Sequence, residues 1–240
     1  MHSALILCSG GLDSVVLSNY IKKSLKYQKI SILFFDYGQR NFKEERKSSK
    51  KCAKEIRAVF KEIDLNFVKA FSTSLLNKKS IPKKLSLKEL KSTKNESEKW
   101  YVPSRNFIFL SIAISYAESL FIKNNEKSSI FMGFKNEGKD SYPDASEKFI
   151  KKINEYSNYF VKGNPRVLAP LIKMDKEDII NLGKKLNVNF KETYSCYNGG
   201  NNHCGFCLSC RLRQEGFYWA NIKDPTKYKI KIKDFRTATN

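Results

Sequence analysis

The chain has 240 residues, of which 41% are hydrophobic, and a formal net charge of +21 at pH 7. A chain of this length forms one large domain, or one domain with a small appendage. The sequence shows neither a signal peptide nor the ~18 consecutive apolar residues of a membrane-spanning helix, so we expect a cytoplasmic protein without a membrane partner. The positive charge comes mostly from lysines dispersed along the chain, which indicates solvated faces rather than a specific nucleic-acid partner.

Short apolar runs alternate with longer segments of helical periodicity. Strands are predicted at 4–8, 30–36, 64–68 and 129–133, and helices at 14–25, 43–60, 104–122, 146–160, 176–186 and 208–221. This alternation is typical of βαβ units, and the strands are apolar enough for a sheet covered on both faces. We therefore predict the α/β class, a parallel sheet with helices on both faces, and a ligand site at the carboxyl ends of its strands.

The first strand leads into a glycine turn, Ser9-Gly10-Gly11-Leu12-Asp13-Ser14, and then into a helix. Two glycines allow a tight turn and close approach of a ligand to the backbone. The unpaired N–H groups at the start of the helix, together with the helix dipole, attract a phosphate. The phosphate motifs G-x-x-x-x-G-K-[ST] and G-x-G-x-x-G are both absent. An ordinary Gly-Gly turn between strand and helix is the alternative interpretation.

The glycine turn resembles the pyrophosphate loop (PP-loop) of ATP pyrophosphatases, which grips the phosphates that leave as pyrophosphate. The resemblance implies ATP as cofactor, with Mg²⁺ close to Asp13. The residues expected to contact ATP are Leu7, Cys8, Ser9, Gly10, Gly11, Leu12, Asp13, Ser14, Val15, Val16 and Leu17.

Four of the six cysteines are clustered, as Cys196, Cys204, Cys207 and Cys210. In a chain expected to be cytoplasmic, such clustering favours a metal over disulfides. Four cysteines with no open position describe a structural Zn²⁺ site, and an Fe–S cluster is the alternative. We predict a nucleotide-binding domain over 1–190, and a segment over 191–240 that carries a Cys₄ zinc knuckle packed on that domain.

Two segments differ from the rest in composition. Residues 77–99 are rich in Lys, Ser, Glu and Asn, and we expect a surface loop or a lid there. Residues 228–234 alternate between isoleucine and lysine, which predicts a strand at an edge or at a partner contact.

The glycine loop and the cysteine cluster together resemble one family closely, the 7-cyano-7-deazaguanine synthases of the PP-loop superfamily, whose fold is adenine nucleotide alpha hydrolase-like. The resemblance runs from about residue 3 to Tyr228, nearly the whole chain. It extends to Asp36-Tyr37-Gly38-Gln39-Arg40, Val102-Pro103-Ser104-Arg105-Asn106, Tyr142-Pro143-Asp144, Pro170-Leu171 and Ser195-Cys196-Tyr197.

The resemblance implies a carbon–nitrogen ligase of the EC 6.3.4.20 type. Its substrate would be 7-carboxy-7-deazaguanine, which ATP adenylates with release of pyrophosphate. Ammonia would displace AMP to form the amide, and a second ATP would drive loss of water to the nitrile. The product feeds queuosine or archaeosine biosynthesis. The family commonly forms homodimers, so we expect one here.

Such chemistry needs positioning and charge neutralisation rather than a protein nucleophile. We predict Asp13, Arg105 and Lys176 as catalytic residues, the two cations holding phosphates. For the substrate, Asp144 would accept the guanine-like N–H groups and Tyr142 would stack on the base. Gln39 and Arg40 are further candidates, for the substrate carboxylate. A solvated lysine at 176 and ordinary turn residues at 142–144 are the simpler interpretations.

One position departs from the family pattern, because Ala145 stands where the family usually has cysteine. This leaves open a repurposed relative that joins the deazaguanine acid to another amine. A tRNA-modifying PP-loop enzyme is a second possible function, and a non-catalytic zinc-knuckle protein that binds nucleic acid is a third. A zinc-knuckle nucleic-acid binder leaves the glycine loop, Arg105 and Asp144 unexplained.

Overall fold

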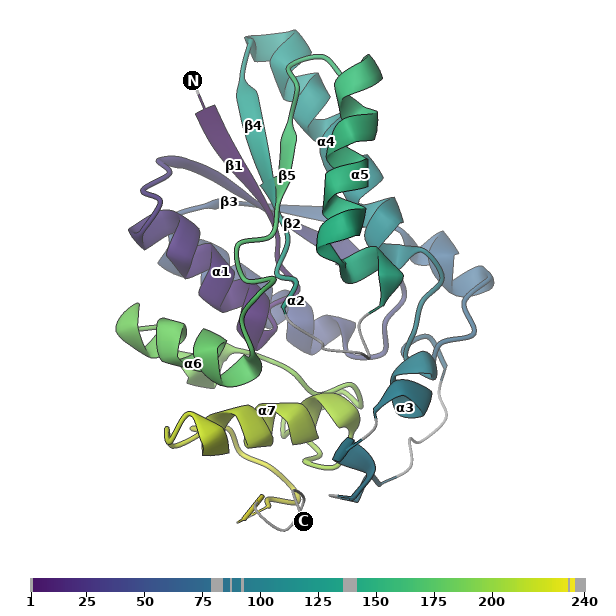
Figure 1. Ribbon diagram of the computed structural model, residues 1–240, viewed down its shortest axis with the longest axis vertical. Coiled ribbons are helices and arrows are strands. Elements are labelled where there is room, and N and C mark those ends of the chain that lie inside the picture. Colours follow the sequence, from purple (N-terminus) through teal and green to yellow (C-terminus); the bar gives the residue numbers. More distant parts are fainter. Residues whose placement is uncertain are drawn as a thin grey trace.

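The computed structural model describes residues 2–78, 84–86, 88–91, 93–135, 142–232 and 234–235. A five-stranded sheet lies at its centre (Figure 1). The strands are β1 (His2–Leu7), β2 (Lys29–Asp36), β3 (Val59–Asp64), β4 (Lys127–Phe131) and β5 (Arg166–Leu168). Their order is β3-β2-β1-β4-β5 and every pairing is parallel, which confirms the predicted fold class.

Helices cover both faces of the sheet (Figure 1). The longer helices are α1 (Leu12–Lys23), α2 (Phe42–Glu55), α4 (Arg105–Asn124), α5 (Glu147–Phe160), α6 (Lys176–Lys185) and α7 (Leu208–Trp219). Alternate residues of β1 face opposite sides, as the pleat requires. Ala4 and Ile6 join a core with α1, α2, α6 and α7, while Leu5 and Leu7 join a second core with α4 and α5.

The strand order places a reversal beside β1. The chain builds β1, β2 and β3 outward in one direction, and β4 then pairs with the other edge of β1. At such a reversal the connections leave the sheet on opposite faces, which opens a crevice at the carboxyl ends of the strands. The glycine loop follows β1 directly, so it lies at this crevice.

One predicted strand is wrong. Residues 64–68 form the end of β3 and most of a 3-10 helix, Asn66–Ala70, while the first two residues of β3 fall in the predicted helix 43–60. The helix α2 ends at Glu55, and Arg57 then adopts a left-handed conformation with φ 56°. β3 is an edge strand with a largely exposed, charged pattern, so it lacks the apolar run that identifies the central strands.

Three smaller features also differ from expectation. The three-residue strand β5 is too short to give a periodic signal. The segment 77–99 includes residues outside the described ranges, but its described part forms a 3-10 helix (Lys88–Lys91) and a short helix α3 (Lys94–Glu98). Within 228–234, whose residue 233 is outside the described ranges, no strand forms, and Tyr228 makes one isolated bridge with His203.

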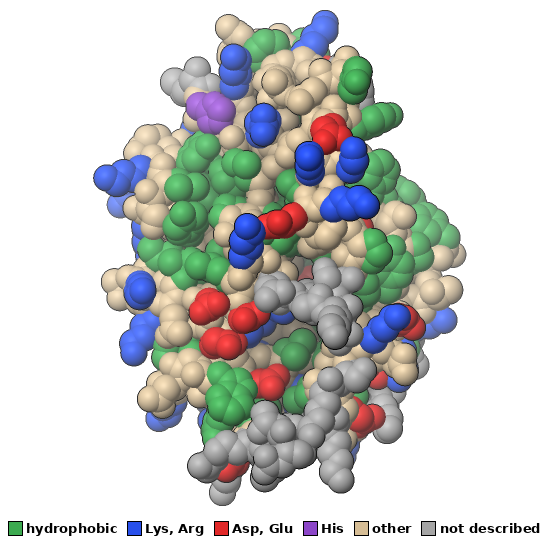
Figure 2. All heavy atoms as spheres, viewed as in Figure 1, with side chains coloured by type: hydrophobic (Ala, Val, Ile, Leu, Met, Phe, Trp, Pro, Cys, Tyr) green, Lys and Arg blue, Asp and Glu red, His purple; other side chains and the backbone are tan. Residues whose placement is uncertain are grey.

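Within the described ranges α4 alone has the length and apolar content of a membrane-spanning helix. Its Leu110, Ala113 and Ala117 are buried in the core beside the sheet. Lys and Arg side chains are scattered over the face shown in Figure 2, in keeping with the dispersal read from the sequence.

Candidate active site

A cavity of about 300 Å³ opens at the carboxyl ends of β1 and β2. The glycine loop, the start of α4, the first residue of α6 and the segment before the cysteine cluster all contribute to its wall. The three predicted catalytic residues, Asp13, Arg105 and Lys176, therefore line one cavity although they lie far apart in the sequence.

The backbone of the glycine loop is held by α2. Gly10 has a φ of 81°, and a Cβ at this position would lie 2.7 Å from the Glu45 carbonyl oxygen, from Ser48 Cβ and from Ser49 N. Ser49 Oγ also donates a hydrogen bond of 2.8 Å to the Cys8 carbonyl. Only glycine fits a left-handed turn pressed this closely against a helix.

Apart from Gly10, which belongs to neither, the predicted ATP contacts separate into two groups. The cavity is lined by Leu7, Cys8, Ser9, Gly11, Leu12, Asp13 and Ser14. Val15, Val16 and Leu17 belong instead to the buried core beneath the loop, so their side chains face away from the cavity wall.

Lys176 and Asp13 form the main ion pair of the cavity. Lys176 Nζ lies 2.8 Å from Asp13 Oδ1 and 2.6 Å from Oδ2, and both side chains are partly buried. Lys176 is the first residue of α6, and its side chain packs against Gly216 of α7. A Cβ added to Gly216 would lie 2.3 Å from Lys176 Cγ. The lysine is thus a cation held in place at the glycine loop rather than a solvated one.

Arg105 lies against an aromatic wall. Its Nη1 donates to the Tyr37 hydroxyl at 3.3 Å, and its guanidinium lies 5.6 Å from the centre of the Tyr37 ring. Phe35 and Phe109 stack with ring centres 4.2 Å apart, and Tyr37 packs on Phe109. Burial raises the pKa of Tyr37 to about 12, so its hydroxyl stays protonated at neutral pH. These aromatic rings offer a flat apolar surface on which a ligand ring could stack, and the Arg105 guanidinium lies beside that surface.

Asp144 and Tyr142 line a smaller neighbouring cavity of about 40 Å³. Arg105 and Tyr197 line both cavities, so the two adjoin. Asp144 Oδ2 is buried without a hydrogen-bond partner in the described part of the chain, whereas the Tyr142 ring stacks on Tyr101 with centres 5.4 Å apart. A buried carboxylate oxygen without a donor is costly, and a ligand N–H would satisfy it.

Gln39 and Arg40 are not among the residues that line either cavity. Gln39 is buried, accepts a hydrogen bond from Tyr37 N and donates one to the Phe35 carbonyl. It also donates to Glu45 Oε2 at 3.2 Å. Gln39 therefore stabilises the loop after β2 through hydrogen bonds to its backbone.

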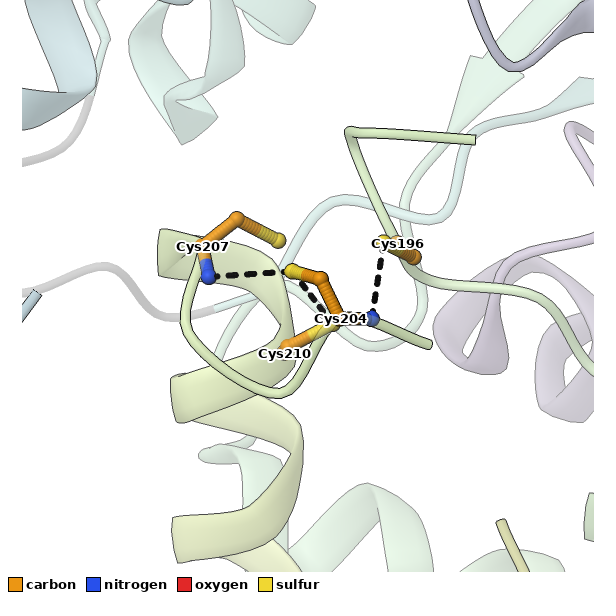
Figure 3. A group of neighbouring side chains, drawn as sticks. All are labelled: Cys196, Cys204, Cys207 and Cys210. Carbon is orange, nitrogen blue, oxygen red and sulfur yellow. Dashed lines mark hydrogen bonds between the residues drawn. The ribbon is translucent and has the colours of Figure 1, made fainter. Parts of the chain in front are cut away.

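The four clustered cysteines lie together, with all four sulfur atoms within 4.8 Å of one another and all four side chains buried (Figure 3). Backbone N–H groups of Cys204 and Cys207 donate to the Sγ atoms of Cys196 and Cys204 respectively, each at 3.3 Å (Figure 3). Four sulfur donors gathered in this way could hold one metal ion, and a closed set of four thiolates fits structural zinc.

The segment that carries the cluster also contacts the active site. Tyr194 N donates to the Gly10 carbonyl at 2.9 Å, and Asn41 Nδ2 donates to the Cys196 carbonyl at 3.1 Å. His203 is buried and its Nε2 lies 3.0 Å from Ser195 N. Burial lowers the pKa of His203 to about 4, so the ring is neutral and accepts this hydrogen bond.

Glu45, Phe109 and Arg213 are among the residues that line the cavity but are not predicted from the sequence as site residues. Arg213 is 1% exposed and donates to Thr193 Oγ1 and Ser195 Oγ at 2.7 and 3.1 Å. Glu45 lies in the first turns of the helix that follows the 36–40 string. This nearness to the carboxyl end of β2 is the one signal that could have found it.

Known proteins resemble this chain over most of its length. A sequence model of the family described as queuosine biosynthesis protein QueC matches residues 3–221. A 7-cyano-7-deazaguanine synthase of Methanococcus maripaludis is 37% identical over 237 residues, covering 95% of this chain and 99% of the relative. The synthase of Methanosphaera stadtmanae is 36% identical over 228 residues, covering 94% and 97%. A solved U34-tRNA thiolase NcsA from Methanococcus maripaludis, with its 4Fe-4S cluster, has a TM-score of 0.43 and 14% identity, covering 92% of this chain and 64% of the thiolase.

Proposed function

The chain belongs to the queuosine biosynthesis protein QueC family, and on that premise we propose that it converts 7-carboxy-7-deazaguanine and ammonia to 7-cyano-7-deazaguanine at the expense of ATP. The chain is a ligase, as its curated relatives are. The observation that carries the proposal is the meeting of a glycine loop, Asp13, Lys176 and Arg105 in one cavity.

In the first half-reaction the substrate carboxylate attacks the α-phosphate of ATP and pyrophosphate leaves. We assign the N–H groups of the loop 9–14 to the pyrophosphate, because they lie at the start of α1 with its dipole. We assign Lys176 and Arg105, both in the cavity wall, to neutralise phosphate charge. Asp13 is the carboxylate we assign to Mg²⁺, which when bound would balance the charge of the phosphates.

For the deazaguanine ring we assign Asp144 as the acceptor of the N–H groups, since its Oδ2 is buried without a partner among the described residues. The ring would rest on the aromatic side chains around Arg105, with Tyr142 in the adjoining small cavity. We assign no substrate contact to Gln39 and Arg40, because neither lines a cavity.

In the second half-reaction ammonia displaces AMP and leaves the primary amide. A second round of adenylation on the amide oxygen, followed by loss of AMP, would give the nitrile. The same loop and cations serve both rounds, because each one activates a carbonyl oxygen with ATP. The four cysteines would hold a structural zinc ion outside this chemistry.

We also propose that the chain forms a homodimer. Large apolar side chains are exposed on α4 and α5, among them Ile122 (62% exposed), Tyr156 (64%) and Tyr159 (90%). Light scattering should give twice the mass of the chain, and a monomer at micromolar concentration would contradict the proposal.

The experiment that tests the activity is mass spectrometry of the products formed from 7-carboxy-7-deazaguanine, ATP, Mg²⁺ and ammonium. A nitrile, with AMP and pyrophosphate, is the expected result. Ala145 follows Asp144 directly, in the 3-10 helix Pro143–Ala145. A reaction that stops at the adenylate or at the amide would therefore favour a relative that joins the acid to another amine. No reaction by folded, metal-loaded protein would contradict the proposed function.

A further inference from the structure

Glu45 is a carboxylate in the active-site cavity that the proposed chemistry has not yet used. It lies in the first turns of α2, and its carbonyl oxygen is among the atoms packed closest to Gly10. Glu45 lines the same cavity as Asp13, Arg105 and Lys176. Glu45 therefore stands next to the loop on which the phosphates would rest.

Two buried amides hold the Glu45 carboxylate in position. Asn41 Nδ2 donates to Oε1 at 3.0 Å and Gln39 Nε2 donates to Oε2 at 3.2 Å. Each amide is anchored in turn, Gln39 to the Phe35 carbonyl and Asn41 to the Cys196 carbonyl. No Lys, Arg or His within the described ranges forms an ion pair with Glu45. The carboxylate is thus oriented but not neutralised by a bound cation.

The charged groups that act on Glu45 are Glu44 on α2 and Arg105 on α4. Burial raises the pKa of Glu45 to about 7, and the neighbouring Glu44 acts in the same direction. The hydrogen bonds from Gln39 and Asn41 oppose this rise, as does the positive charge of Arg105 on α4. At neutral pH the group therefore exists in both protonation states, which suits an acid–base catalyst.

We propose that Glu45 accepts the proton of the attacking nitrogen when ammonia displaces AMP. The inference rests on the proposed function and adds a catalytic residue to it. The ammonia nitrogen forms a bond to the acyl carbon, the bond from that carbon to the AMP oxygen breaks, and AMP leaves with the electron pair. The surplus proton on nitrogen passes to the Glu45 carboxylate and from there to solvent.

The other acidic groups are less suited to this role. Both oxygens of Asp13 are bound by Lys176, and Asp144 lies in the adjoining small cavity. Neither of the two histidines lines the main cavity. Glu45 is therefore the carboxylate of the cavity wall that combines access with an available lone pair.

The test compares two nucleophiles in Glu45→Gln. Ammonium must lose a proton to attack and another afterwards, whereas hydroxylamine is unprotonated at neutral pH and its adduct loses a proton readily to water. We expect ammonium-dependent amide formation to fall about 100-fold, the scale of general base catalysis. Pyrophosphate release from acid and ATP, and hydroxamate formation from hydroxylamine, should stay within a few-fold of the wild-type chain.

Glu44→Gln is the matched control, because the same change is made one residue away. Glu44 Oε1 accepts a hydrogen bond from Gly200 N, and Glu44 does not line the cavity. Glu44→Gln should keep the ammonium-dependent rate at neutral pH, because loss of the Glu44 charge lowers the pKa of Glu45 and leaves more of it as carboxylate. The wild-type rate per free ammonia should fall as the pH drops through about 7, where Glu45 gains its proton, and Glu45→Gln should lose this dependence.

Three outcomes would decide against the inference. If Glu45→Gln forms amide at the wild-type rate, Glu45 is not the proton acceptor. If it loses pyrophosphate release and hydroxamate formation as strongly as amide formation, Glu45 holds the loop instead. If the wild-type chain itself releases no pyrophosphate with the acid, the proposed function fails, and this inference fails with it.

Discussion

Lys176 and Asp13 lie 163 residues apart and meet with both carboxylate oxygens in contact with one ammonium group. The pair is partly buried, so it is screened less by salt than a surface pair. Arrival of ATP would bring phosphate oxygens that compete with Asp13 for Lys176 and bring Mg²⁺ that competes with Lys176 for Asp13. The ion pair thus holds the two groups in position until the substrate arrives.

We expect Lys176→Met to lower the rate of pyrophosphate release about 100-fold or more, because one cation that stabilises the developing charge is lost. The control is Lys173→Met, three residues earlier, since Lys173 is 83% exposed and pairs only loosely with Glu147 at 3.5 Å. Pyrophosphate release with ATP and 7-carboxy-7-deazaguanine measures both variants. Equal rates in the two variants would show that Lys176 is a structural partner of Asp13 and no more.

At the scale of elements, the contact between α2 and the glycine loop decides the shape of the cavity. Helix α2 brings Glu45, Ser48 and Ser49 against Gly10, so the loop cannot move outward without disturbing a core helix. Helix α2 ends at Glu55, and the chain then enters the sheet as β3 from Val59. The predicted helix 43–60 was too long because the charged edge strand carries no apolar signature.

Gly10→Ala tests this contact through stability. A left-handed alanine costs about 1–2 kcal/mol, and forced overlap in a packed site adds about 1–3 kcal/mol. Gly200→Ala is the control, because Gly200 has a φ of 92° but a Cβ there would have nothing within 4 Å. Urea unfolding should show a clearly larger loss of free energy for Gly10→Ala than for Gly200→Ala. Equal losses would mean that only the backbone conformation matters.

At the scale of the whole molecule, the cysteine cluster and the active site form one connected unit. The segment 194–196 binds the glycine loop through Tyr194 and binds Asn41 through Cys196, and Asn41 in turn holds Glu45. A metal at the cluster would therefore stabilise the loop and the carboxylate as well as its own ligands. This connection extends from the C-terminal part of the chain to the start of α1.

Removal of the metal should lower both stability and activity. A strong chelator is expected to reduce the melting temperature and pyrophosphate release together, because a structural metal contributes directly to the free energy of folding. Cys204→Ser should lose the bound metal, whereas Cys52→Ser, at a buried cysteine outside the cluster, should keep it. Native mass spectrometry measures the metal, and re-addition of zinc should restore both properties. A chelated protein with unchanged melting temperature and activity would contradict this coupling.

The sequence by itself determined the features that depend on local order. Apolar runs identify the central strands β1, β2 and β4, and helical periodicity identifies the longer helices. The spacing from Cys196 to Cys210 identifies the cluster, because near neighbours in the chain cannot lie far apart in space. The glycine loop is also local, since strand, turn and helix follow one another directly.

Only the tertiary structure decided which distant groups share a cavity. Three features depend on segments that are remote in the sequence. They are the Asp13–Lys176 pair, the Asp144 oxygen that lacks a partner among the described residues, and the place of Glu45 near Arg105. Burial raises the pKa of Glu45. The residues next to Glu45 in the sequence do not show that this side chain is buried. The edge strand β3 was likewise decided by its pairing with β2 rather than by its own residues.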